Sequence, residues 1–561
     1  MEFSAAATAS SRCLFPAALF FLFIPFVAAA ATTTNGADSP DFASCLLAAG
    51  VNNFTIAAAA KNSPLHDRLL HFSIQNLRFS NPSAPRPAAV ILPHDLPSLR
   101  DSILCCRSAF LSIRLRSGGH SYEALYLPAD NRSPFALLDL MNLHSVSVDP
   151  DLQTAWLQSG ATLGQLYHAI AATGDPPLAF SGGSCPTVGS GGHIAGGGFG
   201  FLSRKYGLAA DNVLDAVIIT ADGRTLDRES MGEDLFWAIR GGGGGTWGAV
   251  YAWKVRLRPV PYRVSAFNVN RPGSNRRVAD LVHSWQRVAP ELPDEFYLSC
   301  FVGGGLPESH SAGMSATFKG LYLGPAGEAR SIISDRFPEL ELGEAEIREM
   351  SWIESVVFFS GLKGGSVDDL LGRELSPKTF FKAKSDYVRA HIPLPDLIRT
   401  VDLLSEEPKA YLILDPYSGA MARGQSDDLP FPHRGGNLYA IQYLVEWMDG
   451  DDSRREEYLR WIREFYDWMA PMVSDGPRTA YVNYLDLDLG TVGCDGGSRD
   501  PVQEARRWGE KYFLGNYDRL VKVKTAVDPD NVFRNEQSIP PLRSPPEITG
   551  RSKVLGCEFV M

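Results

Sequence analysis

The chain has 561 residues, of which 45% are hydrophobic and 21% charged, with 52 glycines and a formal net charge of −11. This length and composition suit a folded protein of two or three domains and exclude a disordered tail or a fibre. The net negative charge, and the lack of a long run of lysine and arginine residues, argue against nucleic acid or an anionic membrane as the main partner. A small neutral or weakly charged molecule fits better.

An apolar stretch opens the chain, running from Leu14 to Ala31 behind Arg12. Pro16 and Pro25 interrupt it, and it ends in four alanines. The prolines disfavour a spanning helix and the small residues suit signal peptidase, so we predict a secretory signal over residues 1–31. An uncleaved anchor is the alternative. After cleavage we expect no stable membrane association.

Secretion bears on the cysteines and on glycosylation. Eight cysteines are present, and an oxidising compartment lets those outside the signal pair. No two are spaced as a zinc or redox pair, so no metal is expected. Asn53 and Asn131 begin glycosylation sequons, although Pro134 weakens the second.

The first predicted elements after the signal are helices and loops in residues 32–85. A proline-rich join follows, and residues 86–261 alternate short strands with helical pieces and glycine turns. Strands are predicted at 113–116, 136–140 and 213–220, the last entering a hairpin at Asp222-Gly223. Between 251 and 257, alternate residues are apolar, which predicts a strand with one buried face.

Longer amphipathic helices characterise residues 262–477. Apolar residues recur at helical spacing over 278–288 and 458–469, and strands are predicted at 316–323 and 437–445. We take 262–477 as a second, α+β domain. A final segment, 478–545, contains a helix that stops at Asp528-Pro529, and residues 546–561 form a tail.

Two glycine-rich segments, 116–123 and 181–193, each hold one reactive side chain, His120 and Cys185. A third glycine run covers 241–245. Glycine lets backbone N–H groups converge on phosphate oxygens, so these segments predict a site for a diphosphate-bearing cofactor. Neither of the first two segments gives the Rossmann fingerprint in frame after a strand, and the P-loop, metalloprotease and hydrolase motifs are missing from the sequence.

The motifs together resemble those of the plant berberine bridge enzyme-like flavoproteins. The resemblance rests on 116–120, on 185–193 with 196–200 after it, on Arg240 with its five glycines, and on 516–541. It implies an α+β fold with a two-lobed vanillyl-alcohol-oxidase (PCMH-type) FAD-binding domain. An antiparallel sheet in the α+β substrate domain would lie over the flavin, and the C-terminal segment would return to complete the FAD site.

The same resemblance implies FAD held by two covalent bonds, from His120 to the flavin 8α-methyl carbon and from Cys185 to C6. An imidazole nitrogen and a thiolate are nucleophiles able to add to an electron-poor flavin. A disulfide is the alternative for Cys185, and a structural hydrogen bond is favoured for His193. Besides His120, Cys185 and His193, the residues expected to bind FAD are Arg116, Ser117, Gly118, Gly119, Ser121, Val188, Gly189, Gly191, Gly192, Gly196, Gly197, Gly198, Val250 and Asn483.

The family's N-terminal disulfide maps onto Cys45 and Cys105, although the adjacent Cys106 leaves the position open by one residue. The family's catalytic tyrosine maps onto Tyr484, which we expect to act as the base that takes a hydroxyl proton. A phenol needs a lowered pKa for this task. Gln442 and Tyr122 are the other two residues assigned to catalysis. Tyr122 and Tyr481 are expected to line the substrate pocket, with a packing role as the alternative.

Several positions depart from the alcohol-oxidising pattern of the family. Ala440 stands where a lysine is expected, Phe199 replaces a tyrosine and Leu485 an arginine, which predicts a drier, less basic pocket. Gln442 occupies the position of the glutamate base of the berberine-forming enzyme, which makes alkaloid ring closure less expected. Val188 is the residue associated with oxidase rather than dehydrogenase behaviour.

The sequence therefore predicts a secreted, monomeric, bicovalent FAD oxidase. It would transfer a hydride from an alcohol carbon of a sugar, oligosaccharide or monolignol-like compound to the flavin and then to O2, giving hydrogen peroxide. The expected location is the apoplast or cell wall, with the vacuole or an ER-derived vesicle as the alternative. Alternative functions are oxidative cyclisation of an alkaloid or cannabinoid-like metabolite, and a flavin-loaded defence protein of low turnover.

Overall fold

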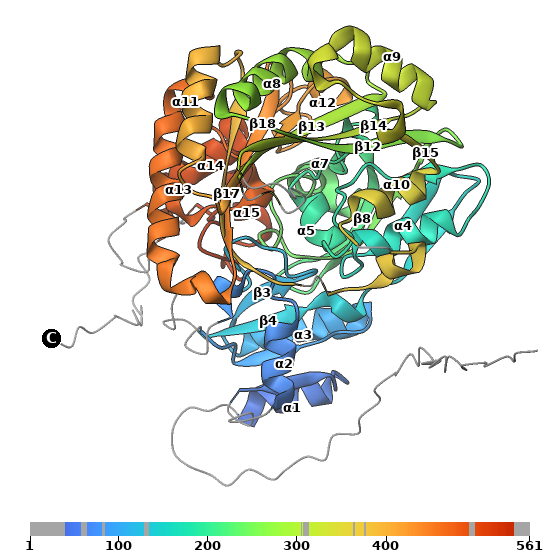
Figure 1. Ribbon diagram of the computed structural model, residues 1–561. Helices are drawn as coiled ribbons and strands as arrows, with labels where there is room; N and C mark the ends of the chain where they lie inside the picture. Colours follow the sequence, from blue (N-terminus) through green and yellow to red (C-terminus); the bar gives the residue numbers. More distant parts are fainter. Residues whose placement is uncertain are drawn as a thin grey trace, which may run out of the picture. The chain divides into compact units, whose positions relative to one another are not determined.

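Three larger β-sheets carry the fold, and each forms from its own stretch of the chain. The computed structural model describes residues 40–57, 64–80, 85–127, 134–304, 306, 313–362, 365–374, 377–492 and 500–542. Residues 41–561 belong to one compact unit. Helices pack on the sheets and most strand pairs are antiparallel, which is the α+β fold that the sequence predicts (Figure 1).

The first sheet uses short apolar segments near the N-terminus. Its order is β1 (Phe54–Ile56), β2 (Ala89–Ile91), β4 (Phe135–Asp139) and β3 (Ser112–Arg116). The last three run parallel, and every residue of β2 and β4 is buried, as expected for parallel strands covered on both faces. The predicted strands at 113–116 and 136–140 are confirmed to within a residue. β3 ends where the first glycine-rich segment begins.

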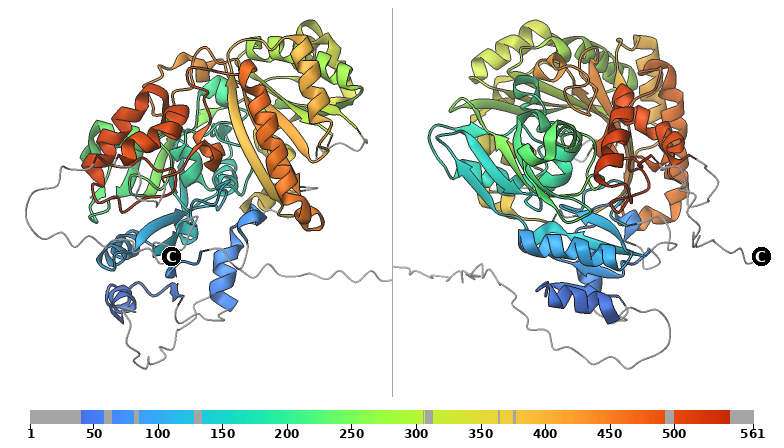
Figure 2. Two further views of the ribbon diagram at one scale, coloured as in Figure 1. Left: turned by 90° about the vertical axis from the view of Figure 1, so that its left-hand side faces the viewer. Right: turned by 180° about the vertical axis from the view of Figure 1, so that it is seen from behind.

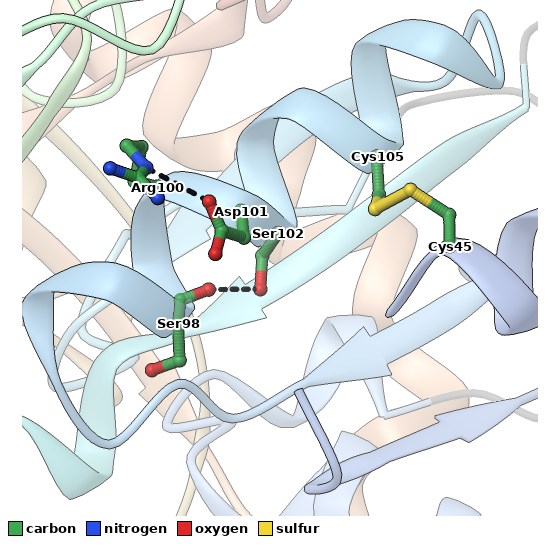
Figure 3. The surroundings of a disulfide bond; sticks show 6 residues. All are labelled: Cys45, Ser98, Arg100, Asp101, Ser102 and Cys105. Carbon is green, nitrogen blue, oxygen red and sulfur yellow. Dashed lines mark hydrogen bonds and ion pairs between the residues drawn. A yellow bond between two sulfur atoms is a disulfide. The ribbon is translucent and has the colours of Figure 1, made fainter. Parts of the chain in front are cut away.

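A disulfide ties the first helix to this sheet. It joins Cys45 on α1 (Pro40–Ala48) to Cys105 on α3 (Leu96–Ser108), the pairing that the resemblance implies (Figure 3). α3 begins at a capping box in which Asp95 and Ser98 each accept from the other's backbone N–H. Cys106 is buried as a free thiol.

The second sheet is antiparallel throughout. Its strands lie in the order β5 (Val146–Asp149), β6 (Thr154–Gln158), β10 (Ala249–Arg256), β8 (Val213–Ile219) and β9 (Thr225–Leu226). The hairpin predicted at Asp222-Gly223 joins β8 to β9, and Gly223 adopts the positive φ of 82° that its turn requires. On β10, Trp253 and Val255 are fully buried, as the alternation predicts.

The third sheet has seven antiparallel strands and two different faces. Its order is β15 (Arg348–Met350), β12 (Val264–Pro272), β14 (Ser315–Tyr322), β13 (Phe296–Gly303), β17 (Ala410–Pro416), β18 (Tyr439–Trp447) and β16 (Phe380–Val388). One face packs on the helices α8 (Asn275–Val288), α11 (Leu394–Leu404) and α13 (Arg455–Met469) (Figures 1 and 2). The opposite face of β13, β17 and β18 lines a cavity.

Alternation along the strands separates these faces. Leu412, Leu414 and Tyr443 pack in the apolar cluster on the helix side, whereas Ile413 and Gln442 point to the cavity. The helices predicted at 278–288 and 458–469 and the strands at 316–323 and 437–445 are confirmed, with ends shifted by a few residues.

The C-terminal segment returns to the first two sheets. After α14 (Pro501–Phe513) and α15 (Tyr517–Val527), Phe533 forms a parallel bridge with Ile113 of β3. On the same strand, the Arg114 guanidinium binds both carboxylate oxygens of Glu536, at 3.0 and 3.1 Å. The C-terminal residues 528–541 therefore complete the same wall that carries the first glycine-rich segment.

Some predicted features lie outside the described residues. These are the signal at 1–31, the sequon at Asn131 and the tail at 546–561. Asn53 is described, and its side chain is exposed at the start of β1. None of the helices in the described ranges is both long and apolar enough to span a bilayer.

Candidate functional site

A cavity of about 660 Å3 lies between the third sheet and the glycine-rich segments. Pockets that hold cofactors or drug-sized ligands range from roughly 300 to 1,000 Å3. All three glycine-rich stretches line this cavity, at 117–121, 189–193 and 242–246. The second sheet contributes Val250, and the loop at 481–485 lines the cavity as well. The sequence thus predicted the segments that meet here, although they lie far apart along the chain.

The first two glycine-rich segments pass in direct backbone contact. A Cβ atom at Gly118 would collide with the backbone nitrogen of Gly189, and a Cβ at Gly189 would collide with the Ser117 side chain. Gly119 also has a φ of 75°, which side chains rarely allow. Glycine at these positions lets the two loops approach closely and brings their reactive side chains together.

Thr187 lies between those two side chains. Its Oγ1 is 2.9 Å from Nε2 of His120 and 3.5 Å from Sγ of Cys185. Burial lowers the pKa of His120 to about 4, and the positive charge of Lys378 acts in the same direction. The imidazole is therefore uncharged at neutral pH, which is the state in which it can act as a nucleophile.

The walls of this part of the cavity fit FAD. Ser159 lines the cavity and is 1% exposed, yet its hydroxyl has no hydrogen-bond partner among the described residues. Gly243 and Gly245 have positive φ, and a Cβ at Gly245 would meet only open space. Backbone amides, small hydroxyls and two nucleophiles are the groups expected around a diphosphate-bearing, covalently held cofactor.

Not every residue predicted to bind FAD offers a free group to the cavity. Arg116 is among the lining residues, but its guanidinium is already held by Asp139, at 2.7 Å, and by backbone carbonyls of residues 69 and 70. Gly196, Gly197 and Gly198 lie behind the wall instead. A Cβ at Gly196 would collide with Asn483, and Cβ atoms at the other two would contact Phe431 or His193. These three glycines permit close packing rather than cofactor contact.

His193 and Asn483 support the loop from behind. Nε2 of His193 accepts the Gly183 N–H at 3.1 Å, in agreement with the structural role that the sequence favours for this histidine. Asn483 donates from its side-chain amide to the His193 carbonyl at 3.0 Å. The loop that carries Tyr484 is thereby tied to the second glycine-rich segment.

Three residues predicted for catalysis meet at the other end of the cavity. The Gln442 amide donates to the Tyr122 hydroxyl at 2.6 Å. The rings of Tyr122 and Tyr484 are parallel within 5°, with centroids 5.3 Å apart. Tyr481 packs edge-on against Tyr484, and the ring of Phe199 contacts both. A flat substrate or its hydroxyl group would meet two phenols and an amide here.

Burial raises the pKa of Tyr484 well above its ordinary value. Its neighbours Tyr122, Asp415, Tyr481 and Tyr297 all act in the same direction. Tyr484 is consequently a neutral phenol at physiological pH, able to donate a hydrogen bond.

A buried ionic cluster, which the sequence analysis did not identify, holds the two tyrosines in place. Lys382 on β16 donates to Glu123, next to Tyr122, and at 2.7 Å to Asp486, two residues beyond Tyr484. Lys384 binds the other oxygen of Asp486 at 2.7 Å. Burial alone would lower the pKa of Lys382, but the carboxylates outweigh burial and raise it. The sequence does hold a signal for this cluster, because Lys382 and Lys384 occupy alternate positions of the strand β16.

Comparison with known proteins places these features in context. The family described as "Berberine and berberine like" matches residues 480–540, and an "FAD binding domain" family matches 87–228. "Berberine bridge enzyme-like D-2" of Nicotiana tabacum is 50% identical over 95% of this chain and 96% of that protein. "Reticuline oxidase" of Papaver somniferum is 45% identical, over 94% and 97%. The structure of berberine bridge enzyme from Eschscholzia californica superposes with a TM-score of 0.85 at 44% identity, covering 90% of this chain and 100% of that one.

Proposed function

The chain belongs to the berberine bridge enzyme-like family of FAD-dependent oxidoreductases, and on that premise we propose that it is a secreted oxidase with a bicovalent flavin. His120 would bond the flavin 8α-methyl carbon and Cys185 the C6 position. The observation that carries the linkage is that both nucleophiles line one cavity and share Thr187 as neighbour. Cys185 is a free thiol, and His120 is uncharged.

The substrate we propose is an alcohol carbon of a sugar, oligosaccharide or monolignol-like compound. Bound FAD supplies a two-electron acceptor that takes a hydride and is reoxidised by O2. The chain supplies the positioning: Gln442 holds the Tyr122 hydroxyl, and the parallel ring of Tyr484 leaves its phenol available to the reacting oxygen. Because Tyr484 stays neutral, it binds that oxygen as a donor, and accepting the proton requires a group of lower pKa.

Oxidative cyclisation of a specialised metabolite is a second candidate. The similarity to a reticuline oxidase favours it, as does the aromatic surface around Tyr484, which suits a flat, ring-bearing molecule. Gln442 cannot act as a base, and this weighs against a ring closure that depends on a carboxylate at that position.

Anaerobic bleaching of the flavin tests these assignments. The purified holoprotein is mixed without oxygen with D-glucose, cellobiose, coniferyl alcohol, a benzylisoquinoline alkaloid and a prenylated phenol. Bleaching by a sugar or by coniferyl alcohol supports the alcohol oxidase. Bleaching only by the alkaloid or the phenol supports cyclisation, and a flavin that none of the five reduces indicates a low-turnover binding protein.

The proposal also covers the acceptor and the location. Val188 lines the cavity beside the second glycine-rich segment, where we propose that it leaves O2 a path to the flavin. We propose secretion to the apoplast or cell wall as a monomer. Expression in plant cells, followed by assay of the extracellular fluid and the glycan mass at the exposed Asn53, tests the route.

A further inference from the structure

Asp415 is the only carboxylate among the described residues that line the cavity. It lies on β17, on the same face as Ile413 and Tyr411, which also line the cavity. The residue is 9% exposed, and its Oδ1 accepts a hydrogen bond from the Tyr297 hydroxyl on β13 at 2.8 Å. In the described part of the chain, Asp415 takes part in no ion pair. Burying a carboxylate is costly when its charge is unpaired and a single neutral group donates to it.

The register of the sheet places Ala440 directly across from Asp415 on β18. Ala440 carries only a methyl group, so β18 provides no cation or donor at this point. Two residues along, Gln442 pairs with Ile413 and turns to Tyr122. The carboxylate is therefore next to the groups proposed to hold the substrate, on the wall they share.

The charged and titratable groups around Asp415 define its state. Burial raises the pKa of Asp415 to about 6, while the Tyr297 hydrogen bond and the charge of Lys319 on β14 lower it. Asp415 in turn raises the pKa of Tyr122 and Tyr484. The carboxyl therefore ionises in the physiological range while both phenols stay neutral. Groups in one site whose pKa values are pushed apart divide the acid and base roles between them.

The histidines, the cysteine and the lysine that line the cavity are not available as proton acceptors. His120 and Cys185 are assigned to the flavin, and Lys319 acts on Asp415 as a cation. His193 already uses Nε2 to accept the Gly183 N–H.

We propose that Asp415 is the general base of the reaction, accepting the hydroxyl proton of the substrate. This inference rests on the proposed alcohol oxidation. The O–H bond breaks and its proton passes to the Asp415 carboxylate. The C–H bond of the same carbon breaks and its hydrogen leaves with both electrons as a hydride for the flavin. A C=O bond forms between carbon and oxygen, so atoms and charge balance. Tyr484 donates a hydrogen bond throughout and keeps its proton.

Flavin reduction in stopped flow without oxygen tests the assignment. The probe is whichever of D-glucose, cellobiose and coniferyl alcohol reduces the wild-type holoenzyme fastest. In the wild type we expect the reduction rate to rise with pH through a midpoint near that of the carboxyl. We call this rising part of the pH–rate profile the limb. Asp415→Asn is expected to lose the limb and to slow flavin reduction by about 100- to 10,000-fold, the usual contribution of a general base.

Two further variants separate a base from a structural residue. Tyr297→Phe removes a hydrogen bond that lowers the pKa of Asp415, so the limb should move to higher pH without disappearing. Tyr484→Phe should slow reduction but keep the limb. Infrared titration of the holoprotein supplies a readout apart from turnover. Burial also raises the pKa of Asp386 to about 6, so two carboxyl bands should titrate in the wild type, and Asp415→Asn should lose one of them and keep the other.

The outcomes are distinguishable. Asp415 is not the base if the Asp415→Asn variant keeps its flavin spectrum and its flavin is reduced at a rate within about threefold of the wild-type rate. Loss of the limb in Tyr484→Phe with its retention in Asp415→Asn would return the role to the phenol. If none of the three alcohols reduces the wild-type flavin, the alcohol oxidase itself is wrong, and the Asp415 assignment falls with it.

Discussion

The rings of Tyr122 and Tyr484 lie parallel, 5.3 Å apart, although one follows the first glycine-rich segment and the other belongs to the C-terminal segment. Lys382 connects the two segments, because it binds Glu123 beside one tyrosine and Asp486 beyond the other. This end of the cavity is therefore held by an ionic cluster whose lysines lie on β16 of the third sheet.

Replacing Lys382 with methionine should destabilise the protein and disturb this end of the cavity. The change leaves Glu123 and Asp486 buried, with Lys384 as the only lysine still bound to Asp486. Removing one partner of a buried ion pair costs about 3–5 kcal/mol. A lower midpoint of thermal unfolding and an altered flavin circular dichroism spectrum would report both effects.

Lys409→Met is the matched control. Lys409 pairs with Asp451 at 2.7 Å, but both side chains are well exposed, at 40% and 38%. Exposed ion pairs contribute less than about 1 kcal/mol. Equal losses of stability in the two variants would show that the cluster behind the tyrosines has no special role.

The disulfide offers a prediction that also decides between neighbouring cysteines. Cys45 and Cys105 are 60 residues apart in sequence, and closing a loop of this length stabilises a fold by about 4 kcal/mol. Cys45→Ser should lower the thermal midpoint accordingly. Cys106→Ala removes one small buried group and should cost about 1 kcal/mol. If Cys106→Ala instead matches Cys45→Ser, and peptide mapping finds Cys106 oxidised, the pairing in the structure is wrong.

Oxygen reactivity should depend on Val188. Val188→Leu adds a methylene group at the cavity wall, and we expect reoxidation of the reduced flavin by O2 to slow by at least about tenfold while reduction stays nearly unchanged. Val146→Leu makes the same change on β5, outside the cavity lining, and should leave both rates unaltered. Unchanged reoxidation in Val188→Leu would remove the gating role from this residue.

Each covalent bond should survive the loss of the other. His120 and Cys185 lie on separate loops, so His120→Ala should keep flavin attached through Cys185, and Cys185→Ala through His120. Only the double variant should release all flavin on denaturation. Absorption spectra of the denatured single variants, which differ between an 8α-linked and a C6-linked flavin, check this. Release of flavin by a single variant would show that only one bond forms.

The glycine-rich segments could be identified from the sequence because each motif, with its reactive side chain, lies in one short stretch of the chain. The helices at 278–288 and 458–469 were predictable for the same reason, since a periodic apolar stripe carries its own signal. The sequence therefore indicated most of the segments that line this end of the cavity, and Gly196, Gly197 and Gly198 are outside that lining. Those three pack against side chains from distant segments, which no local pattern reveals.

The substrate end depended on contacts between distant strands. Asp415, Tyr297 and Lys319 come from three strands of one sheet and meet only through its register. Period-two alternation assigns such residues to a face, but it does not tell which face borders a cavity. The raised pKa of Tyr484 likewise follows from burial among neighbours that the sequence does not bring together.

Acid precipitation of the purified protein tests the bicovalent flavin most directly. The denatured polypeptide should remain yellow in the pellet, and its intact mass should exceed that of the polypeptide by one FAD. Peptide mapping should then find the flavin bridging the peptides that contain His120 and Cys185. A colourless pellet, with free FAD in the supernatant, would contradict the covalent linkage on which the proposed function is built.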